Sequence, residues 1–232
     1  MEYRQLQLQP RLQLLADMIP QGTRLADIGT DHGYLPVWLM QQGRIAFAIA
    51  SDINSDPLDH ARQSAQEYGV EGIDFRLCGG LDGIKPEEID TIVIAGMGGE
   101  TIIQILDSAP WTKGGKHILL LQPMTKTELL RDWLADNGYR FVRERLVWDK
   151  DILDPIMEVC GGEQAKLTAL QRTVGVTMSD DPLYPEYLTQ HIAKLQRAID
   201  GMMQSSSDKN REKAEALTTV LHELEQERER LS

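Results

Sequence analysis

The stretch LADIGTDHGYLP, residues 25–36, is the part of the sequence on which the fold prediction depends. Apolar and small residues surround a single acid, Asp27, and Gly29 ends this short segment. After Gly33, an apolar segment with Pro36 near its start has the pattern of a helix, because proline fits the first helical turn. The stretch therefore predicts a buried strand, a glycine turn and a helix. In an open α/β sheet, ligands bind outside the carboxyl ends of the strands, where this turn would lie.

Short apolar segments alternate with helical patterns along the chain as far as Gly162. A helical stripe runs from Tyr3 to Ile19, interrupted by Pro10. The segments predicted as strands are 24–29, 44–53, 73–78, 91–97, 116–123, 141–149 and 155–161, and the further helices are expected at 34–43, 55–69, 99–109 and 125–138. This order indicates the α/β class, with a mainly parallel sheet covered by helices on both faces. The last two strands are close in sequence and are expected to pair antiparallel at one edge.

The composition changes after Gly162, which divides the chain into predicted domains at 1–162 and 163–232. Two helical segments follow the turn-rich stretch SDDPLYPEY, with a polar connector, MQSSSDKN, between them. Their apolar residues are spaced alternately four and three, as in Leu188, Ile192 and Leu195. This spacing predicts an antiparallel helical hairpin with a coiled-coil seam.

The bulk composition excludes several classes of protein. The net charge of -12 argues against broad, nonspecific nucleic-acid binding, although a local basic patch is still compatible with it. Two cysteines, Cys78 and Cys160, make no disulfide framework and no metal-ligand spacing, so a reducing, cytoplasmic setting is expected. The first residues do not resemble a signal peptide. No apolar run reaches the roughly 20 residues that cross a bilayer, so no membrane association is expected.

Two acids near the carboxyl ends of neighbouring strands indicate a nucleotide-like cofactor. Asp52 follows Gly29 by 23 residues and is predicted at the end of the second strand, where a carboxylate can accept hydrogen bonds from both ribose hydroxyls. NAD would need a phosphate-binding G-x-G-x-x-G, which is absent. S-adenosylmethionine has no phosphate, and its cationic amino-acid end suits Asp27. The pattern therefore favours S-adenosylmethionine over NAD, the alternative being a plain strand–turn–helix junction.

Asp31 and His32 lie between the two glycines of the turn. In a functional interpretation, both side chains face the reacting methyl group. In a structural interpretation, Asp31 caps the following helix and His32 packs locally. The residues alone leave both interpretations open.

A second glycine cluster, IAGMGGE at residues 94–100, ends the fourth predicted strand. Its bare backbone can approach a flat ligand closely. The D/N-P-P-Y motif of many base methylases is absent here, which argues against methylation of an exocyclic amine. After the next strand, Gln122 can bind the edge of a base. Alternatively, this is only a strand-to-helix loop with Thr125 and Glu128 as a capping box.

Four motifs together resemble a known family. DIGTDHGYLP, ASDINSDPL, IAGMGGETI and LQPM are similar to motifs of the bacterial tRNA (adenine-22-N1)-methyltransferases of the TrmK type. The resemblance covers roughly residues 11–162, and the helical hairpin is similar to the C-terminal domain of that family. It implies a class I (Rossmann-like) methyltransferase fold, S-adenosylmethionine as methyl donor and tRNA as acceptor.

The resemblance implies that Asp27, Gly29 and His32 belong to the cofactor pocket and that Asp52 binds the ribose. The motifs and the resemblance together give the set of candidate site residues, and no metal is expected. Asp31, His32 and Gln122 are the catalytic candidates, with Asp31 as a candidate proton acceptor. One departure concerns Gly79, because the family has Asn or Asp at this place facing the cofactor adenine; Asp82 is near enough in sequence to substitute. The residues expected to bind the cofactor are Asp27, Gly29, Thr30, Gly33, Asp52, Ile53, Gly79, Gly80, Ala95, Gly96 and Met97.

A tRNA partner has to be bound by local cationic clusters in so acidic a chain, and a monomer is expected. The hairpin either contacts tRNA phosphates or is a dimerisation or purely structural element. Two other functions are compatible with the sequence: a methyltransferase for a small molecule or protein, or a tRNA-binding module with a degenerate catalytic domain. The candidate cations are WTKGGKH at 111–117, Lys126, Arg131, Arg140, Arg143 and Arg145, and in the hairpin Lys194, Arg197, Lys209, Arg211 and Lys213.

Overall fold

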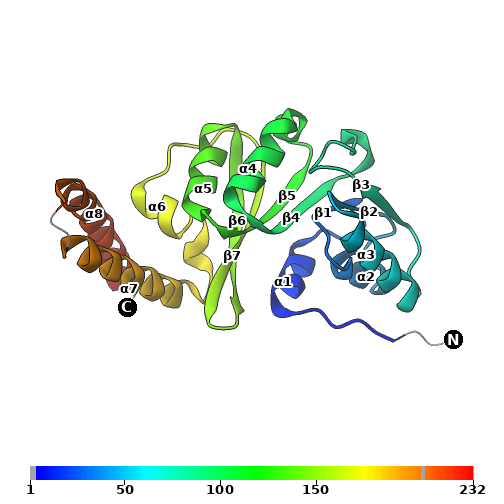
Figure 1. Ribbon diagram of the computed structural model, residues 1–232, viewed down its shortest axis with the longest axis horizontal. Coiled ribbons are helices and arrows are strands. Elements are labelled where there is room, and N and C mark those ends of the chain that lie inside the picture. Colours follow the sequence, from blue (N-terminus) through cyan, green and yellow to red (C-terminus); the bar gives the residue numbers. More distant parts are fainter. Residues whose placement is uncertain (1–3, 205–206, 232) are drawn as a thin grey trace.

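The computed structural model describes residues 4–204 and 207–231 and contains one mixed sheet between two helical layers, with a helical arm at one end (Figure 1). The described residues form seven strands in the order β3-β2-β1-β4-β5-β7-β6. The strands are β1 Leu25–Ile28, β2 Ala48–Asp52, β3 Ile73–Leu77, β4 Thr91–Gly98, β5 Ile118–Thr125, β6 Tyr139–Asp149 and β7 Ile152–Gly161. The helices are α1 Pro10–Met18, α2 Tyr34–Gln41, α3 Ser55–Glu67, α4 Gly99–Ser108, α5 Thr127–Asp136, α6 Ala169–Val174, α7 Tyr184–Met203 and α8 Asp208–Arg230.

The predicted α/β sheet is confirmed, including its antiparallel edge. Strands β1 to β5 pair in parallel, whereas β7 pairs antiparallel with both β5 and β6. Strand β1 lies between β2 and β4, where the strand order reverses. This topological switch point is where an open sheet of this class binds its ligand. The glycine turn after β1 therefore lies at the predicted place.

Alternate residues of β1 face the two helical layers, because successive side chains of a strand point to opposite faces. Ala26 and Ile28 belong to the cluster that packs under α4 and α5, whereas Leu25 packs with α1 and α2. By the same alternation, Asp27 faces the α1–α2 side. An acid is thus placed at the centre of the sheet, beside the cleft.

Several local expectations are wrong. The helical stripe expected from Tyr3 becomes a helix only at Pro10, since proline lacks the amide hydrogen that an interior helical position donates; Tyr3 itself lies outside the described residues. Thr125 belongs to β5, and α5 begins after Lys126 without a side-chain cap, so the Thr125–Glu128 capping box does not form. Asp31 does not cap α2, whose N-cap is Gly33. No helix within residues 4–204 and 207–231 is long and apolar enough to span a membrane.

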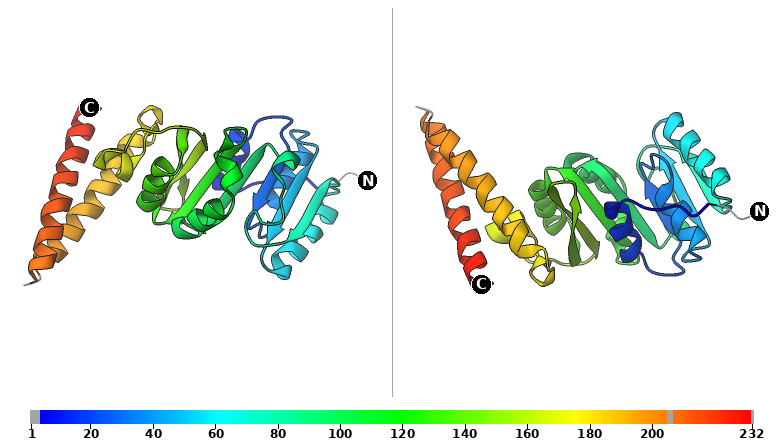
Figure 2. Two further views of the ribbon diagram at one scale, coloured as in Figure 1. Left: turned by 90° about the horizontal axis from the view of Figure 1, so that it is seen from above. Right: turned by 90° about the horizontal axis from the view of Figure 1, so that it is seen from below.

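The arm consists of α7 and α8, which lie side by side in both views of Figure 2. Their apolar stripes meet in one cluster that includes Leu188 and Ile192 from α7 and Leu221 from α8. Leu146 of β6 and Leu153 of β7 belong to the same cluster, so the arm packs against the tip of the β6–β7 hairpin. The predicted helical hairpin is confirmed, and the domain boundary after Gly162 stays a prediction.

A buried ion pair joins the sheet to the arm. Arg131 of α5 and Glu144 of β6 are both fully buried, with Nε and Oε1 3.0 Å apart. Arg131 also donates to the main-chain carbonyl of Thr173 at 3.0 Å, and Glu144 accepts from the amides of Val176 and Thr177. Burial alone would lower the pKa of Arg131, but Glu144 and then Tyr187 raise it above its usual value. The pair therefore fixes the segment around residues 173–177 that leads to the arm, and the expectation that Arg131 contacts RNA is wrong because its side chain is fully buried.

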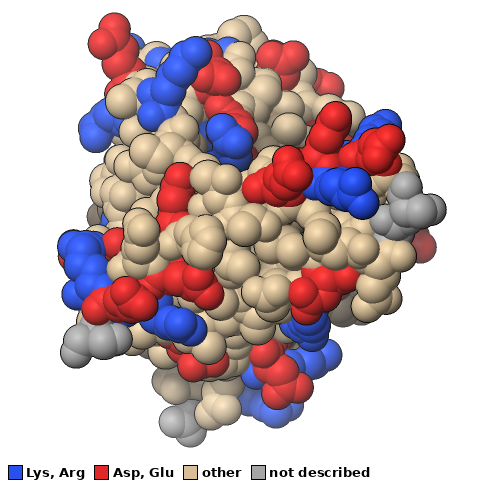
Figure 3. Space-filling view, turned by 90° about the vertical axis from the view of Figure 1, so that its left-hand side faces the viewer, with Lys and Arg blue, Asp and Glu red and all other residues tan. Residues whose placement is uncertain are grey.

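Other candidate cations also lie away from the cleft. Residues 111–117 precede β5, and Arg140 stands at the start of β6. Strand β6 runs in the same direction as β5, because β7 is antiparallel to both. Both segments therefore lie at the amino ends of the parallel strands, opposite the carboxyl ends of β1 and β4. Arg143 is paired with Glu158. On the face of the arm shown in Figure 3, basic and acidic side chains are intermixed.

Replacement of Glu144 by Gln should destabilise the fold strongly, because it leaves the buried Arg131 charge uncompensated. We expect a loss of about 3–5 kcal/mol in the free energy of unfolding. The matched control is Asp132→Asn, which removes the exposed ion pair between α5 and Arg172 of α6 and should cost at most about 1 kcal/mol. Urea denaturation followed by circular dichroism measures both. Equal effects for the two variants would show that the buried pair has no special role.

Candidate active site

Two adjoining cavities lie across the carboxyl ends of β1, β2 and β4. The first, the Asp27 cavity, has a volume of about 340 Å³ and lies between the glycine turn, α1 and the end of β4. The second, the Asp52 cavity, has a volume of about 290 Å³ and is lined by the ends of β2 and β4, the loop after β3, and α4. Gly29 lines both cavities. The arrangement suits an elongated ligand that crosses the turn.

The glycine turn has a geometry that other residues would not allow. Gly29 has a φ of +75°, and its amide and that of Thr30 donate to the carbonyl of Ser51 at 2.8 and 3.0 Å. A Cβ atom on Gly29 would collide with the terminal methyl of Met97. Gly33 has a φ of +63°, and a Cβ there would lie 2.9 Å from that of Ala61. The turn thus keeps bare backbone at the junction of the two cavities, where the Met97 methyl lies.

Asp27 is a buried acid without a cation. Burial raises its pKa to about 6, and a hydrogen bond from Thr30 opposes this shift. Among the described residues, no Lys, Arg or His forms an ion pair with Asp27. A buried carboxylate of this kind gains most from a cationic ligand, because a nearby positive charge restores its ionised form. The ammonium group of S-adenosylmethionine fits this requirement.

Asp52 stands at the end of β2, where a ribose ligand is expected. Its Oδ1 accepts from the amide of Asn54 at 2.8 Å, which orients the carboxylate. Ile53 is 73% exposed and lines the Asp52 cavity with Gly80. A carboxylate beside an exposed apolar side chain and bare backbone is suited to the ribose and purine of an adenosine.

Asp82 lies close to Gly79, on the side where a side chain at residue 79 would project. Both residues line the Asp52 cavity. A Cβ atom on Gly79 would lie 3.7 Å from Oδ2 of Asp82. The carboxylate of Asp82 therefore lies beside the position that a side chain at residue 79 would occupy.

Asp31 and His32 lie at the mouth of the Asp27 cavity. His32 Nε2 and Asp31 Oδ2 are 3.5 Å apart, and the His32 ring is stacked with the rings of Tyr34 and His60, each at 5.0 Å. The histidine thus both packs locally and lines the cavity. Asp31, His32 and His60 could together hold a metal ion, since their ligand atoms lie within 4.8 Å of one another. The prediction of no metal is untested.

Gln122 is completely buried, and both ends of its amide are engaged. Its Oε1 accepts from the Gly96 amide at 2.9 Å and from Arg11 Nη1 at 2.7 Å. Its Nε2 faces Oδ2 of Asp154 at 3.4 Å and the sulfur of Met124 at 3.6 Å. Direct contact with a base would require these bonds to break, so the geometry favours a positioning role for Gln122.

Arg11 and Asp154 are neighbours of the site that the sequence reasoning missed. Arg11 is the cation within an apolar helical stripe, and this is a signal that could have been used. Asp154 precedes Pro155 in β7, between β5 and β6, and nothing in the local pattern marks it. Of the second glycine cluster, Gly96 lines the Asp27 cavity, whereas a Cβ on Gly99 would lie 2.6 Å from the carbonyl of Lys126.

Comparison with known proteins agrees with this geometry. The methyltransferase-domain family matches residues 8–157. The tRNA (adenine(22)-N(1))-methyltransferase of Bacillus subtilis is 29% identical over 231 residues, which cover 96% of this chain and 97% of that protein.

Two solved structures share nearly the whole fold, arm included. One is a putative tRNA (m1A22) methyltransferase of Streptococcus pneumoniae in complex with S-adenosyl-L-methionine, with a TM-score of 0.77, 32% identity, and coverage of 91% of this chain and 98% of that one. The other is M. capricolum TrmK in complex with S-adenosyl-homocysteine, with a TM-score of 0.78, 26% identity, and coverage of 97% and 99%. The chain therefore belongs to the methyltransferase-domain family and, within it, to the TrmK-type proteins that its motifs resemble.

Proposed function

We propose that this protein transfers a methyl group from S-adenosylmethionine to N1 of the adenine at position 22 of tRNA, in the cytoplasm. The observation that carries the substrate is the similarity to the B. subtilis tRNA (adenine(22)-N(1))-methyltransferase along 96% of this chain. A similarity confined to the sheet would support only methyl transfer in general. The observed similarity also includes the arm, so it supports tRNA as the methyl acceptor.

The buried Asp27 supports the choice of donor. In the proposed complex, Asp27 holds the ammonium group, Asp52 accepts from the ribose hydroxyls, and Asp82 stands at the adenine. S-adenosylmethionine supplies a methyl group on a positively charged sulfonium. In the proposed complex, Asp82 takes the place of the side chain that Gly79 lacks, since a Cβ atom on Gly79 would lie 3.7 Å from Oδ2 of Asp82.

Methylation at N1 requires little acid–base catalysis by the protein. Adenine N1 carries its lone pair in the plane of the base and can form the bond to the methyl carbon directly, so the protein mainly has to position the base. N1 lies on the pairing edge, and the target therefore has to be unpaired or flipped out. Asp31 stays our candidate for a group that accepts a proton from the product, and the monomeric state also stays a prediction.

Purified protein with labelled S-adenosylmethionine and a tRNA transcript tests the activity. We expect 1-methyladenosine in the digested product by mass spectrometry, and no transfer to a transcript with G in place of adenine 22. Transfer to N6 of adenine or to cytosine would show that the proposed chemistry is wrong. Transfer to a protein or a small molecule but not to tRNA would favour the alternative acceptors.

Asp52→Ala should weaken S-adenosylmethionine binding by about 2–4 kcal/mol, since two hydrogen bonds to a charged acceptor are lost. The matched control is Asp56→Ala, which removes an exposed acid from the first turn of α3. Isothermal titration calorimetry measures both affinities. An Asp52→Ala protein that binds as tightly as the control would exclude Asp52 as the ribose ligand.

The affinity for S-adenosylmethionine should depend on pH through Asp27. Because the pKa of this acid is raised to about 6 in the free protein, the carboxylate is protonated as the pH falls below 6, and the ligand then has to displace a proton. We expect an affinity about tenfold weaker at pH 5 than at pH 7.5. Asp27→Asn should bind weakly at both pH values. His32→Gln should keep the pH dependence; its loss in that variant would assign the effect to the neighbouring imidazole.

The hairpin cations are tested without removing the arm, because truncation after Asp181 would expose Leu146 and Leu153. The combined substitution of Lys209, Arg211 and Lys213 by Ala should weaken tRNA binding and lower its salt dependence, as each lost phosphate contact reduces the salt slope by about one. S-adenosylmethionine affinity should not change. An unaltered tRNA affinity in filter-binding assays at two salt concentrations would leave the tip of the arm with a structural role only.

A further inference from the structure

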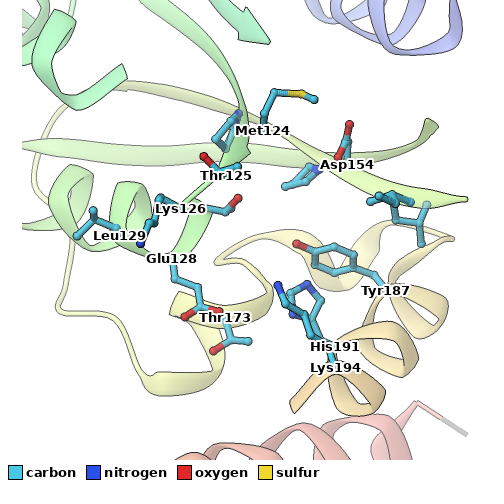
Figure 4. Close-up of a pocket in the computed structure, with 15 residues that line it drawn as sticks. Met124, Thr125, Lys126, Glu128, Leu129, Asp154, Thr173, Tyr187, His191 and Lys194 are labelled. Atoms are coloured by element: carbon cyan, nitrogen blue, oxygen red, sulfur yellow. The ribbon is translucent and has the colours of Figure 1, made fainter. Parts of the chain in front are cut away.

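A cavity of about 440 Å³, the junction pocket, lies where the arm meets the sheet (Figure 4). Its walls come from the end of β5, the start of α5, the start of β7, and α7. Figure 4 shows Tyr187, His191 and Lys194 projecting from α7 towards the residues that follow β5. The volume is in the range of small-ligand sites, about 300–1,000 Å³. The pocket can therefore hold a nucleotide.

Gln122 is bonded both to residues that line the Asp27 cavity and to residues that line the junction pocket. The Gln122 oxygen binds Arg11 and the Gly96 amide, and both of these residues line the Asp27 cavity. The Gln122 nitrogen faces Asp154 and Met124, which line the junction pocket. A group bound beside Asp154 thus lies next to the place where the methyl donor is expected.

The lining of the pocket is suited to a nucleobase. Met124 is 52% exposed and Ile152 64% exposed, so large apolar side chains stand open at the rim. Tyr187 and His191 form an edge-to-face pair with ring centroids 4.4 Å apart on the opposite wall. Apolar and aromatic surfaces are the usual contacts of a base that has left its stack.

Asp154 supplies the polar group that distinguishes one base from another. Its carboxylate is half-buried, and Gln122 directs its amide nitrogen towards Oδ2 at 3.4 Å. Since the Gln122 oxygen is already occupied, Asp154 is the side-chain acceptor at this wall of the pocket. Adenine presents an N6 amine beside N1, and an ionised carboxylate can only accept. Guanine presents an oxygen at the same position, which the carboxylate would repel.

Cations stand at the α5 and α7 walls of the pocket. Lys126 and Lys194 are exposed lining residues, from the loop before α5 and from α7 respectively. They can bind the phosphates on either side of a nucleotide, whereas Asp154 lies on the inner wall, beside Gln122. Glu128 also lines the α5 wall near Lys126, whereas the lining residues of α7 include no acid, so Lys194 is the cation better placed to bind a phosphate.

We propose that the junction pocket takes the unpaired acceptor purine of the RNA and that Asp154 accepts a hydrogen bond from its N6 amine. This proposal rests on the proposed function and adds the binding site and the specificity-determining residue. Asp154 thereby selects adenine over guanine and holds negative charge beside the ring that becomes cationic when N1 is methylated.

The proposed hydrogen bond between the N6 amine and Asp154 can be removed either from the RNA or from the protein, and both changes test the proposal. The two substrates are a tRNA with adenine at position 22 and one with purine, which lacks the 6-amino group. The wild-type protein should methylate the adenine substrate with a kcat/KM at least tenfold higher. Asp154→Ala should reduce kcat/KM for adenine severalfold and that for purine much less, so that the difference between the two substrates narrows to the part caused by the weaker nucleophilicity of N1 in purine. The matched control is Asp151→Ala, an exposed acid in the turn between β6 and β7, which should behave like the wild type.

Binding without the methyl donor gives a second readout. The dissociation constant of the adenine-containing tRNA, measured by fluorescence, should rise severalfold in Asp154→Ala and not in Asp151→Ala. S-adenosylmethionine affinity should be the same in all three proteins, which shows that the variants are folded.

The outcomes separate this proposal from the function on which it rests. If the wild-type protein methylates adenine 22 but Asp154→Ala keeps both its rate and its preference for the 6-amino group, the base is read elsewhere and the junction pocket assignment falls. If the wild-type protein methylates no tRNA, the proposed function itself fails, and this assignment fails with it.

Discussion

The buried pair of Arg131 and Glu144 is the interaction that determines how the arm stands against the sheet. Each charge is withdrawn from water and is compensated by the other and by main-chain groups at residues 172–177. Such a pair contributes little net stability compared with apolar packing, but a shift that separated the two side chains would leave a buried charge unpaired, which is costly. The segment 172–177, which leads to the arm, is bonded to both members of the pair, and α7 forms one wall of the junction pocket.

The same logic applies at smaller scale to Gln122. A buried amide has two different ends, and here each end faces a different cavity. Its oxygen fixes Arg11 and the backbone at Gly96, and its nitrogen fixes Asp154. One uncharged side chain in the middle of β5 therefore relates the geometry of the donor site to that of the junction pocket. Through these bonds, Gln122 can align the two cavities with each other.

The fold was accessible from the sequence because its signals are local. The stretch at residues 25–36 combines an apolar run, two glycines that adopt positive φ, and an early proline. These features indicate a buried strand, a tight turn and the start of a helix, respectively. The same holds for the acid at the end of β2. The functional contacts missed from the sequence are non-local. Arg11 meets Gln122 across 111 residues, and Asp154 meets it across 32, through the antiparallel edge of the sheet.

Some of the predictions about cationic clusters were wrong for a related reason, because they also depend on non-local contacts. Arg131 has the sequence surroundings of a surface cation on an amphipathic helix, yet it is fully buried. Its partner, Glu144, lies on the next strand, and no rule of helical spacing connects the two. The cations of residues 111–117 are close together in sequence, but they precede β5, so the parallel sheet places them at the end opposite the cleft. Only the sheet topology shows whether a cluster of cations lies near the cleft or far from it.

The net charge of -12, which conflicts with RNA binding at first sight, agrees with the proposed chemistry once the charges are placed. A methyl donor with a cationic sulfonium and ammonium favours an acidic cleft, and Asp27, Asp52 and Asp82 provide one. The reaction then moves positive charge from the donor to the purine, beside Asp154 in the proposed complex. Negative charge is favourable throughout this path and unfavourable only for phosphates. These stay outside, where Lys126 and Lys194 are exposed. In the proposed complex, the central acids thus face the cationic donor and the methylated purine, and the exposed lysines face the phosphates of the RNA.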